Sequence, residues 1–190
     1  MNNAVDDAAL VRRSLAGDPQ AQRALVERHR ALVFRVARNA TGNDDDALDI
    51  TQEAFVAAFT ALRRFDSERS FPAWISRITL NKCRDWSRRR NVRRFLGLPI
   101  SDAGAQQIPD DAVLPDEIVA SRVELEMVAR AVALLPHKLK EALLLRAIEG
   151  LSQAEAASVL GVSEKTIETR VYRARQKLGE LLRDQTITRV

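Results

Sequence analysis

A proline-rich acidic segment divides this chain of 190 residues into two parts. Residues 96–120 contain three prolines, two glycines and five acidic residues, but no lysine or arginine. Such a composition sustains no helical period, and unstructured loops of this length are uncommon inside compact domains. We therefore predict a flexible linker over residues 96–120 between two small domains, at residues 1–95 and 121–190. A long surface loop within a single domain is the alternative.

The net charge changes sign between these three parts. Residues 1–95 carry 18 basic and 12 acidic side chains, a net charge of +6, whereas residues 96–120 have a net charge of −5. Residues 121–190 carry 12 basic and nine acidic side chains, a net charge of +3, so the whole chain has +4. A total of +4 is weak support for nucleic-acid binding, and the distribution of the charge matters more than its sum.

The composition argues against several classes of protein. Cys83 is the single cysteine, which excludes an intrachain disulfide and a thiol-rich metal site. His29 and His137 lie far apart in the sequence, and we expect no metal and no cofactor. The N-terminus is acidic, and no run approaches the ~18 apolar residues of a membrane span, so we expect a cytoplasmic protein without membrane insertion. Cys83 is expected to serve packing, although a redox role stays open.

Helix signals recur in both domains, and strand signals are nearly absent. Asp18 and Pro19 form an N-cap followed by proline in the first turn. Ser152 and Glu155 form a capping box, in which each side chain satisfies a free backbone N–H. We predict an all-α protein with about four helices in each domain. The expected helices cover residues 19–42, 43–65, 70–94, 136–150, 152–161 and 163–183.

A helix-turn-helix motif is predicted over residues 152–178. Gly161 permits a tight turn between a short capped helix and a longer basic one. On the second helix the spacing i, i+4, i+7, i+11 places on the inner side Ile167, Val171, Ala174 and Leu178. The outward residues are Lys165, Glu168, Thr169, Tyr172, Arg173, Gln176 and Lys177. Those near the start of the helix would reach base edges, and the basic ones further along would contact phosphates. An ordinary helical hairpin with a solvated basic face is the alternative.

The helix expected over residues 70–94 has a basic stripe. Its spacing places on one face Arg77, Asn81, Arg84 and Arg88. Such a stripe suits a nucleic-acid backbone, with the asparagine able to read a base. The loop before the helix is flanked by Phe65, Phe71 and Trp74, and aromatic rings beside a basic helix can stack on unpaired bases. Packing at the helix entry is the alternative, and for Phe65 and Trp74 taken singly it is the better explanation.

Residues 44–53 have the opposite sign, with five acids and no base. Helix N-termini favour acids, which explains Asp44 to Asp46 but accounts less well for Asp49 and Glu53. One helical surface can display Asp45, Asp49, Gln52 and Glu53 together. An acidic surface cannot face DNA, so we expect it to face a basic protein partner.

Two blocks of the sequence resemble conserved regions of one bacterial family. The segments DALDITQEAFVAAFTALRRFD and SFPAWISRITLNKCRDWSRRR closely resemble region 2 of extracytoplasmic-function (ECF) sigma factors. The segment ALLPHKLKEALLLRAIEGLSQAEAASVLGVSEKTIETRVYRARQKL resembles their region 4. The order of the blocks, the linker and the total length also fit this family.

The resemblance implies a promoter-specificity subunit of RNA polymerase, with no enzymatic activity of its own. Region 2 would bind the clamp coiled coil of core polymerase through Asp45, Asp49, Gln52 and Glu53. It would also melt the −10 element and capture its bases, with contacts implied at Phe65, Ser70, Phe71, Trp74, Arg77, Asn81, Arg84 and Arg88. Region 4 would bind the polymerase flap and read the −35 duplex through Lys165, Glu168, Thr169, Arg170, Tyr172, Arg173, Arg175 and Lys177. The family further implies an anti-sigma partner, a stress or envelope response, and a linker that occupies the RNA exit path.

Three positions depart from the family pattern. Leu48 stands where an acid is usual, so the polymerase-facing surface has one charge fewer. Glu168 stands where a basic residue is common. An acid at this position repels phosphate and can accept a hydrogen bond from cytosine N4. The chain therefore need not read the common GGAAC-type −35 sequence. His137 replaces a frequent glutamate and is expected to be a surface residue without function.

Two other functions fit parts of the sequence. A stand-alone helix-turn-helix regulator would use only the C-terminal motif and would need a dimer and palindromic operators. A nuclease would need the segment DDDALD as a metal site, but no His or Lys set neighbours it. For a sigma factor we predict negligible specific promoter binding by the free protein, because unstacking costs about a few kcal/mol per base step. Compact packing of the two domains, or an anti-sigma factor, would then mask both DNA-binding surfaces.

Overall fold

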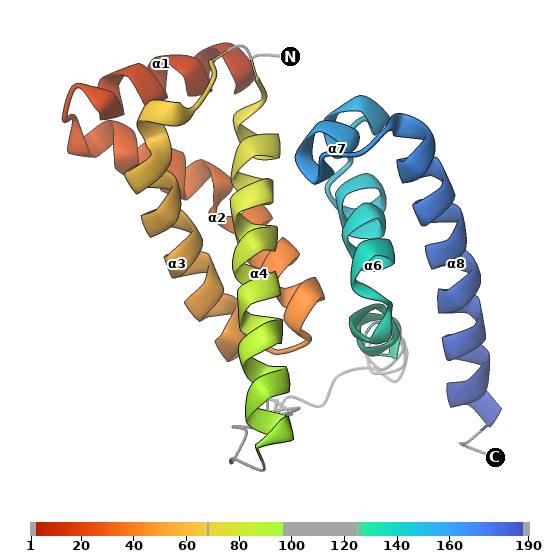
Figure 1. The fold of residues 1–190 in the computed structure, drawn as a ribbon. Helices are drawn as coiled ribbons and strands as arrows, with labels where there is room; N and C mark the ends of the chain where they lie inside the picture. The colour runs from red at the N-terminus through yellow and green to blue at the C-terminus, as the bar shows by residue number, and fades with distance from the viewer. Residues whose placement is uncertain (1–2, 68, 97–124, 126, 188–190) are drawn as a thin grey trace, which may run out of the picture.

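The computed structural model describes residues 3–67, 69–96, 125 and 127–187. Every regular element in these ranges is a helix, which confirms the all-α fold class. Residues 97–120 of the predicted linker lie outside the described residues. Figure 1 shows the helices in two groups that lie side by side.

Four helices form the N-terminal half: α1 (Asn3–Leu15), α2 (Pro19–Thr41), α3 (Asp44–Ala61) and α4 (Phe71–Phe95), with a 3₁₀ turn at Leu62–Arg64. Three predicted starts are confirmed, because the side chains of Asp18, Asn43 and Ser70 each accept a hydrogen bond from a first-turn backbone N–H. Gly42 ends α2 at a φ of 76°, a left-handed conformation that glycine adopts without strain.

The core of this half lies where α2, α3 and α4 face one another. Leu25, Val33, Ala54 and Ile75 are each 0% exposed. Burying a large aliphatic side chain contributes about 1.5–3 kcal/mol, so this core fixes the rotation of each helix. The remaining faces of α3 and α4 are thereby held toward solvent or toward the C-terminal half.

The helix α1 was not predicted from the sequence. Asp7 is 2% exposed, and its carboxylate accepts a hydrogen bond from Arg28 at 2.8 Å and lies 3.1 Å from Nε2 of His29. Leu10 and Val11 of α1 are buried in the same core. The helix is therefore held by contacts with α2 that are distant in sequence.

The C-terminal half contains helical residues 127–134, α6 (His137–Leu143), α7 (Gln153–Leu160) and α8 (Glu164–Ile187). The sequence predicted one regular helix over residues 136–150, but in the structure α6 ends at Leu143 and Leu144–Ile148 forms a π-helical turn. Five consecutive residues, 141–145, are buried. A helix with a single buried face cannot bury five residues in a row, but this run, at the end of α6 and the start of the π-helical turn, lies between α4 and α8 (Figure 1).

The predicted helix-turn-helix is confirmed as a structural motif. Ser152 Oγ accepts from the Glu155 N–H at 3.1 Å, and the Glu155 carboxylate accepts from the Ser152 N–H at 2.8 Å. Gly161 ends α7 at a φ of 65°. Ser163 Oγ accepts from the Thr166 N–H at 3.2 Å, which starts α8 as expected.

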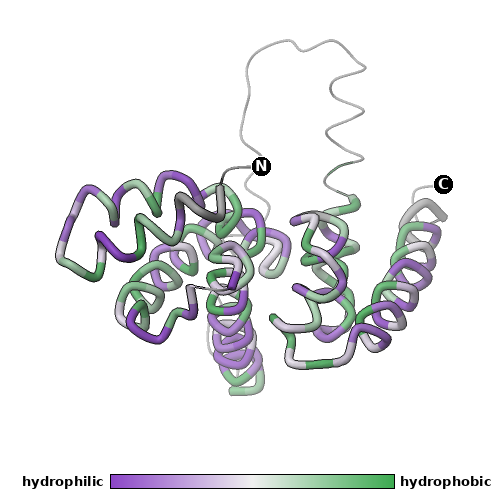
Figure 2. The backbone as a smooth tube through the Cα atoms, turned by 90° about the horizontal axis from the view of Figure 1, so that it is seen from above, coloured by the Kyte–Doolittle hydropathy of each residue, from purple (hydrophilic) through white to green (hydrophobic). Residues whose placement is uncertain are grey.

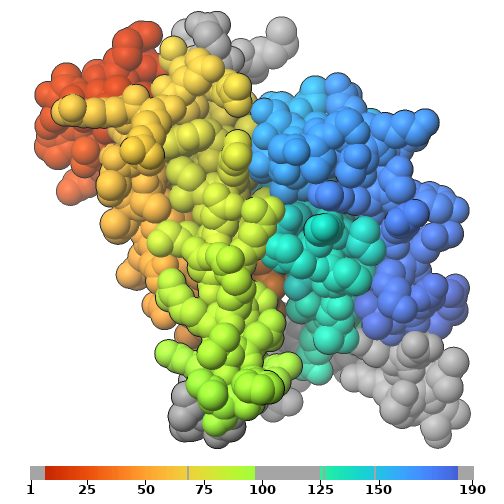
Figure 3. All heavy atoms as spheres, in the orientation of Figure 1, coloured from red at the N-terminus to blue at the C-terminus, as the bar shows by residue number. Residues whose placement is uncertain are grey.

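The two halves pack against each other through apolar side chains. Val36 of α2 and Leu80 of α4 belong to one buried cluster with Leu145, Ala156 and Ile167 of the C-terminal half. Figure 3 shows atoms of α4 in contact with atoms of α6 and α7. Seen from above in Figure 2, α8 lies on the outer side, and hydrophilic residues recur along it. Within the described ranges, no helix combines the length and the apolar character that crossing a membrane requires.

Candidate protein and nucleic-acid interfaces

The predicted acidic face of α3 is exposed along its whole length. All four of its members lie on the solvent side: Asp45, Asp49, Gln52 and Glu53. The other first-turn acids have structural partners, since Asp44 pairs with Arg38 and Asp46 accepts from Trp86 Nε1 at 2.9 Å. Two of the first-turn acids thus stabilise the fold, whereas the four residues of the acidic face stay exposed.

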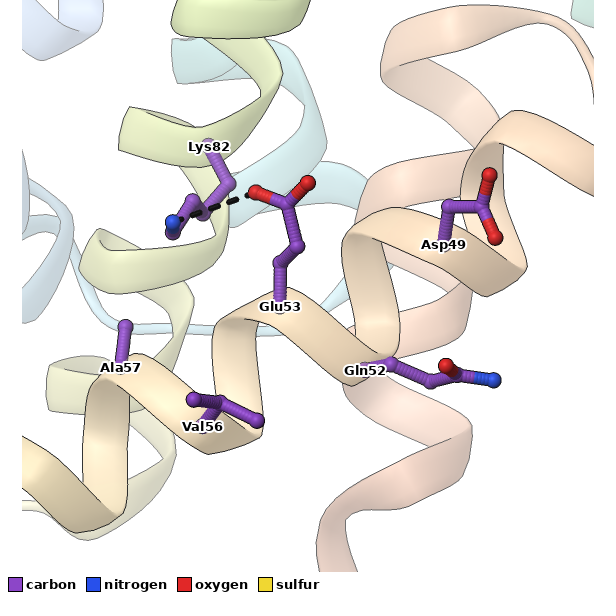
Figure 4. Close-up of a pocket in the computed structure, with 6 residues that line it drawn as sticks. All are labelled: Asp49, Gln52, Glu53, Val56, Ala57 and Lys82. Carbon is purple, nitrogen blue, oxygen red and sulfur yellow. Dashed lines mark hydrogen bonds and ion pairs between the residues drawn. The ribbon is translucent and has the colours of Figure 1, made fainter.

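A shallow pocket follows the acidic face beside α4 (Figure 4). Glu53 turns toward Lys82 of α4 and accepts a hydrogen bond from its Nζ at 3.1 Å, while Asp49 and Gln52 point away from Lys82. Val56 lines the same pocket and is 67% exposed, although it was not predicted as a site residue. Its position, four residues after Gln52, is the signal that could have identified it. Leu48 is also exposed, so this acidic face carries apolar contact area.

Three aromatic rings meet where the predicted −10 loop enters α4. The ring centroid of Phe65 lies 5.4 Å from that of Phe71 and 5.1 Å from that of Trp74. Phe71 is 2% exposed and belongs to the core, whereas Phe65 and Trp74 are half-buried at its edge. Ser70 caps α4, with Oγ accepting from the Ala73 N–H. All three rings therefore pack at the helix entry, and only the two edge rings keep a side toward solvent.

The predicted basic stripe is present on α4, but it is not uniformly free. Arg77, Asn81 and Arg88 are exposed, and Arg88 pairs with Asp85 of the same helix. Arg84 is half-buried because it binds the C-terminal half of the chain through Glu141. His137, for which no role was expected, joins this contact with Nε2 at 3.0 Å from Arg84 Nε.

The outward face of α8 is open to solvent. Its exposed members are Lys165, Glu168, Thr169, Tyr172, Arg173, Arg175 and Lys177, while Arg170 is half-buried. Ile167 and Ala174 are 0% exposed and fix this rotation. A shallow groove between α8 and α6 is lined by Lys138, Leu139, Lys165, Thr166, Thr169, Arg170 and Arg173. Lys138 was not predicted, because no helical spacing links α6 to α8, and it adds positive charge to this surface.

Cys83 has a structural environment rather than a reactive one. It is 5% exposed on the inner side of α4, and burial raises the pKa of its thiol to about 12. The thiolate, which is the reactive form, is therefore negligible at neutral pH. The expected packing role is confirmed. In the part of the chain that the structure describes, no group of three or more His, Cys, Asp or Glu residues could hold a metal ion.

Comparison with known proteins gives two family matches and several whole-chain relatives. The family model for sigma-70 region 2 matches residues 25–93, and the model for sigma-70, region 4 matches residues 125–178. The RNA polymerase sigma factor CnrH of Cupriavidus metallidurans is 40% identical, over 96% of this chain and 97% of its own length. The RNA polymerase sigma factor NccH of Alcaligenes xylosoxydans xylosoxydans is 39% identical, over 95% of this chain and 97% of its own.

Solved structures agree with these matches. A structure of CnrH in complex with the cytosolic domain of CnrY has a TM-score of 0.69 at 36% identity, and covers 94% of this chain and 97% of that one. A structure of the sigma factor RpoE in complex with the anti-sigma factor NepR from Bartonella quintana has a TM-score of 0.66 at 24% identity, covering 85% and 96% of the two chains. The second likeness supports the fold alone.

Proposed function

This chain belongs to the ECF family of RNA polymerase sigma factors, and we propose how its surfaces divide the work of promoter recognition. It is a transcription initiation factor and not an enzyme. Regions 2 and 4 of such a factor bind core RNA polymerase and promoter DNA. The assignment of individual residues to these partners is our proposal.

The acidic face of α3 is the proposed contact with the clamp coiled coil of core polymerase. Its support is the exposure of Asp45, Asp49, Gln52 and Glu53 together with the apolar side chain of Val56. Charges of one sign steer a basic partner, and the exposed valine offers area that the partner can desolvate. Glu53 would enter this contact by exchanging Lys82 for a polymerase residue.

The entry of α4 and its basic stripe are the proposed −10 surface. Arg77, Asn81, Arg84 and Arg88 would follow one DNA strand, with arginines on phosphates. Phe65 and Trp74 keep solvent-facing sides on which an unstacked base can lie. Phe71 is buried beneath them and Ser70 caps the helix, so these two residues position the others.

The exposed face of α8 is the proposed −35 surface. Its first turns carry Lys165, Glu168 and Thr169, and Tyr172 and Arg173 follow on the same side. In a helix-turn-helix the N-terminal part of the second helix meets base edges in the major groove. Glu168 would then accept a hydrogen bond from cytosine N4. The later basic residues, Arg175 and Lys177, and the half-buried Arg170 would contact phosphates.

Control by an anti-sigma factor is part of the proposal. The relative CnrH has been solved in complex with the cytosolic domain of CnrY. We propose that a protein of this kind holds the present chain inactive until a stress signal removes it. Its place of action would be the cytoplasm, because core RNA polymerase works there.

One observation carries this division of labour: within one chain, two helical faces rich in basic residues, a partly covered one on α4 and an open one on α8, accompany an exposed acidic face on α3. DNA can bind the first two but not the third, which therefore needs a protein partner. A stand-alone regulator would not require the acidic face.

Transcription from a template library tests the proposal. The purified chain is mixed with core RNA polymerase and linear templates that carry randomised promoter sequences, and transcript 5′ ends are sequenced. We expect transcripts only when both proteins are present, with two enriched elements upstream of the start. The absence of transcripts, together with binding of a dimer to palindromic DNA without polymerase, would instead support a stand-alone regulator.

A further inference from the structure

The two halves of the chain meet at a buried carboxylate. Glu141 of α6 is 3% exposed, and its two oxygens accept hydrogen bonds from Arg84 Nε at 2.6 Å and Arg84 Nη2 at 2.7 Å. His137 Nε2 lies 2.9 Å from the same carboxylate. Glu141 thus holds Arg84 in the bidentate geometry that arginine also uses for phosphate.

Two other polar contacts cross the same interface. Arg35 of α2 pairs with Glu149 at 2.9 Å, and the Glu149 side chain is 1% exposed. Lys140 of α6 donates a hydrogen bond to the Ala40 carbonyl, near the end of α2, at 3.2 Å. Together with the apolar cluster beneath them, these contacts define one specific closed arrangement of the two halves.

The charge on Glu141 depends on its partners. Burial, the largest single influence, raises the pKa of Glu141, but hydrogen bonds from His137 and Arg84 outweigh it and hold that pKa below its usual value. The pKa of Arg84 is raised, chiefly by its hydrogen bond with Glu141. Both groups are therefore charged at neutral pH. A buried carboxylate without its arginine is costly, so the pair forms whenever the two halves pack together.

Arg84 belongs both to this interface and to the proposed −10 stripe. Its Nε and Nη2 are occupied by Glu141, and its Nη1 donates to Asn81 at 3.0 Å. A groove between α4 and α6 is lined by Asn81, Arg84, Asp85, Ser87, Arg88 and His137. The C-terminal half therefore forms one wall of the surface along which a DNA strand would lie.

We propose that Glu141 is an intramolecular competitor for the DNA backbone at Arg84, so that the C-terminal half must leave α4 before the −10 strand can bind. This inference rests on the proposed role of α4 in DNA binding. The closed arrangement lowers the affinity of the free chain for single-stranded DNA. Any partner that separates the two halves releases Arg84 and restores the complete stripe.

Two variants open the interface by different physical means. Glu141→Gln keeps the shape of the side chain but removes the charge that holds Arg84. Ala133→Leu changes no charge; it adds bulk where a Cβ placed on Gly42 would already lie 3.2 Å from the Ala133 Cβ. Glu27→Gln is the matched control, because Glu27 is exposed on α2 and its replacement removes the same single charge.

The readouts are DNA affinity and overall dimension of the full chain. Fluorescence anisotropy measures binding to a labelled 20-nucleotide single strand of mixed sequence, and small-angle X-ray scattering measures the radius of gyration. Glu141→Gln and Ala133→Leu should each bind the strand about fivefold more tightly than the wild-type chain and Glu27→Gln, as expected for a pair worth about 1 kcal/mol. Both should have a larger radius of gyration. Arg84→Ala should expand without gaining affinity, because it loses the phosphate contact as well.

Equal affinities for the wild-type chain and both opening variants would overturn the competition. Expansion without a gain in affinity would also overturn it, and so would a gain in Glu141→Gln that Glu27→Gln matches. Failure of the wild-type chain to initiate with core polymerase would contradict the sigma-factor proposal instead. The two failures can be distinguished, because scattering and strand binding are measured without polymerase, whereas initiation requires it.

Discussion

The two basic helices of this chain, α4 and α8, differ in what covers them. The outward face of α8 is exposed at most positions from Lys165 to Lys177, and the helix packs mainly on α6 and α7 of its own half of the chain. The helix α4 packs on α2 and α3 on one side and on α7 on another, and its Arg84 is bound by Glu141. The same helical periodicity thus produces one open surface and one whose availability depends on the arrangement of the two halves. If the proposed roles hold, recognition of a duplex at α8 is compatible with the closed form, whereas strand capture at α4 is not.

Truncation of the buried isoleucine under each helix is expected to have the largest effect. Ile75 of α4 and Ile167 of α8 are both 0% exposed, and replacement by alanine should lower the free energy of unfolding by about 2–5 kcal/mol in each case. Urea unfolding measures the loss, and hydrogen exchange locates it. Ile75→Ala should lower the hydrogen-exchange protection of α2 and α3, whose side chains share its cluster. Ile167→Ala should lower the protection of α7, of α8 and of the adjoining part of α4, because the cluster around Ile167 contains side chains of both halves. Loss of protection confined to α7 and α8 would show that the halves unfold independently.

Replacement of Glu168 should alter the sequence that α8 reads. A good base contact contributes about 1–3 kcal/mol of discrimination, so Glu168→Ala should relax the preference for one base pair in the −35 element. Selection from randomised −35 sequences in the presence of core polymerase measures this preference. Lys177→Ala is the control, since loss of a phosphate contact should weaken all sequences equally. An unchanged preference in Glu168→Ala would place the base-reading residues elsewhere on α8.

Asp49→Ala should reduce binding to core polymerase while leaving promoter selectivity intact. A single exposed charge contributes about 1 kcal/mol or less, so we expect a decrease of several-fold in competition with a second sigma factor for core. Asp44→Ala is not a suitable control, because Asp44 pairs with Arg38; Glu27→Ala changes the same charge on an exposed site away from α3. Altered promoter choice in Asp49→Ala would contradict the assignment of α3 to a protein partner.

Arg88→Ala should have a smaller effect on initiation and a characteristic effect on its salt dependence. Loss of one phosphate contact on a single strand should lower the slope of log affinity against log salt by about 0.7. Titration of promoter-complex formation at several salt concentrations measures this slope. If Arg88→Ala lowered core binding in the way expected for Asp49→Ala, the separation between the α3 and α4 surfaces would be wrong.

Features determined by nearby residues could be predicted from the sequence. The caps at Asp18, Asn43 and Ser70 depend on backbone groups within three residues, and the structure has each of them. The inward and outward faces of α8 follow from the helical period alone, and Ile167 and Ala174 are buried as expected. The helix-turn-helix is predictable for the same reason.

Features determined by distant residues could not be predicted. Arg84 and Glu141 are 57 positions apart, so the sequence shows Arg84 only as a member of a basic stripe. The helix α1 is held by a contact between Asp7 and Arg28, 21 positions apart, and Asp7 in isolation resembles a surface acid. The π-helical turn in 144–148 is a third feature that no local spacing in the sequence shows. The first two features depend on which segments meet in the folded chain.

The smallest expected effect on transcription concerns Cys83 on the inner side of α4, whose thiol should be inert in the folded chain. Burial raises the pKa of Cys83 from 9.0 to about 12, so folding favours the protonated thiol. The unfolded chain releases this proton near pH 9 and the folded chain does not, and the free energy of unfolding should therefore fall as the pH rises from about 9 toward 12.

At pH 8, alkylation of Cys83 by iodoacetamide should be slower in the native chain than in the urea-unfolded chain by on the order of a thousandfold, with Cys83→Ala as the unlabelled baseline. Peroxide should likewise leave transcription unchanged. Rapid alkylation of the native chain would show that α4 separates from α2 and α3, against which Cys83 packs, even without polymerase, and the tightly packed α4 on which the comparison with α8 rests would then be wrong.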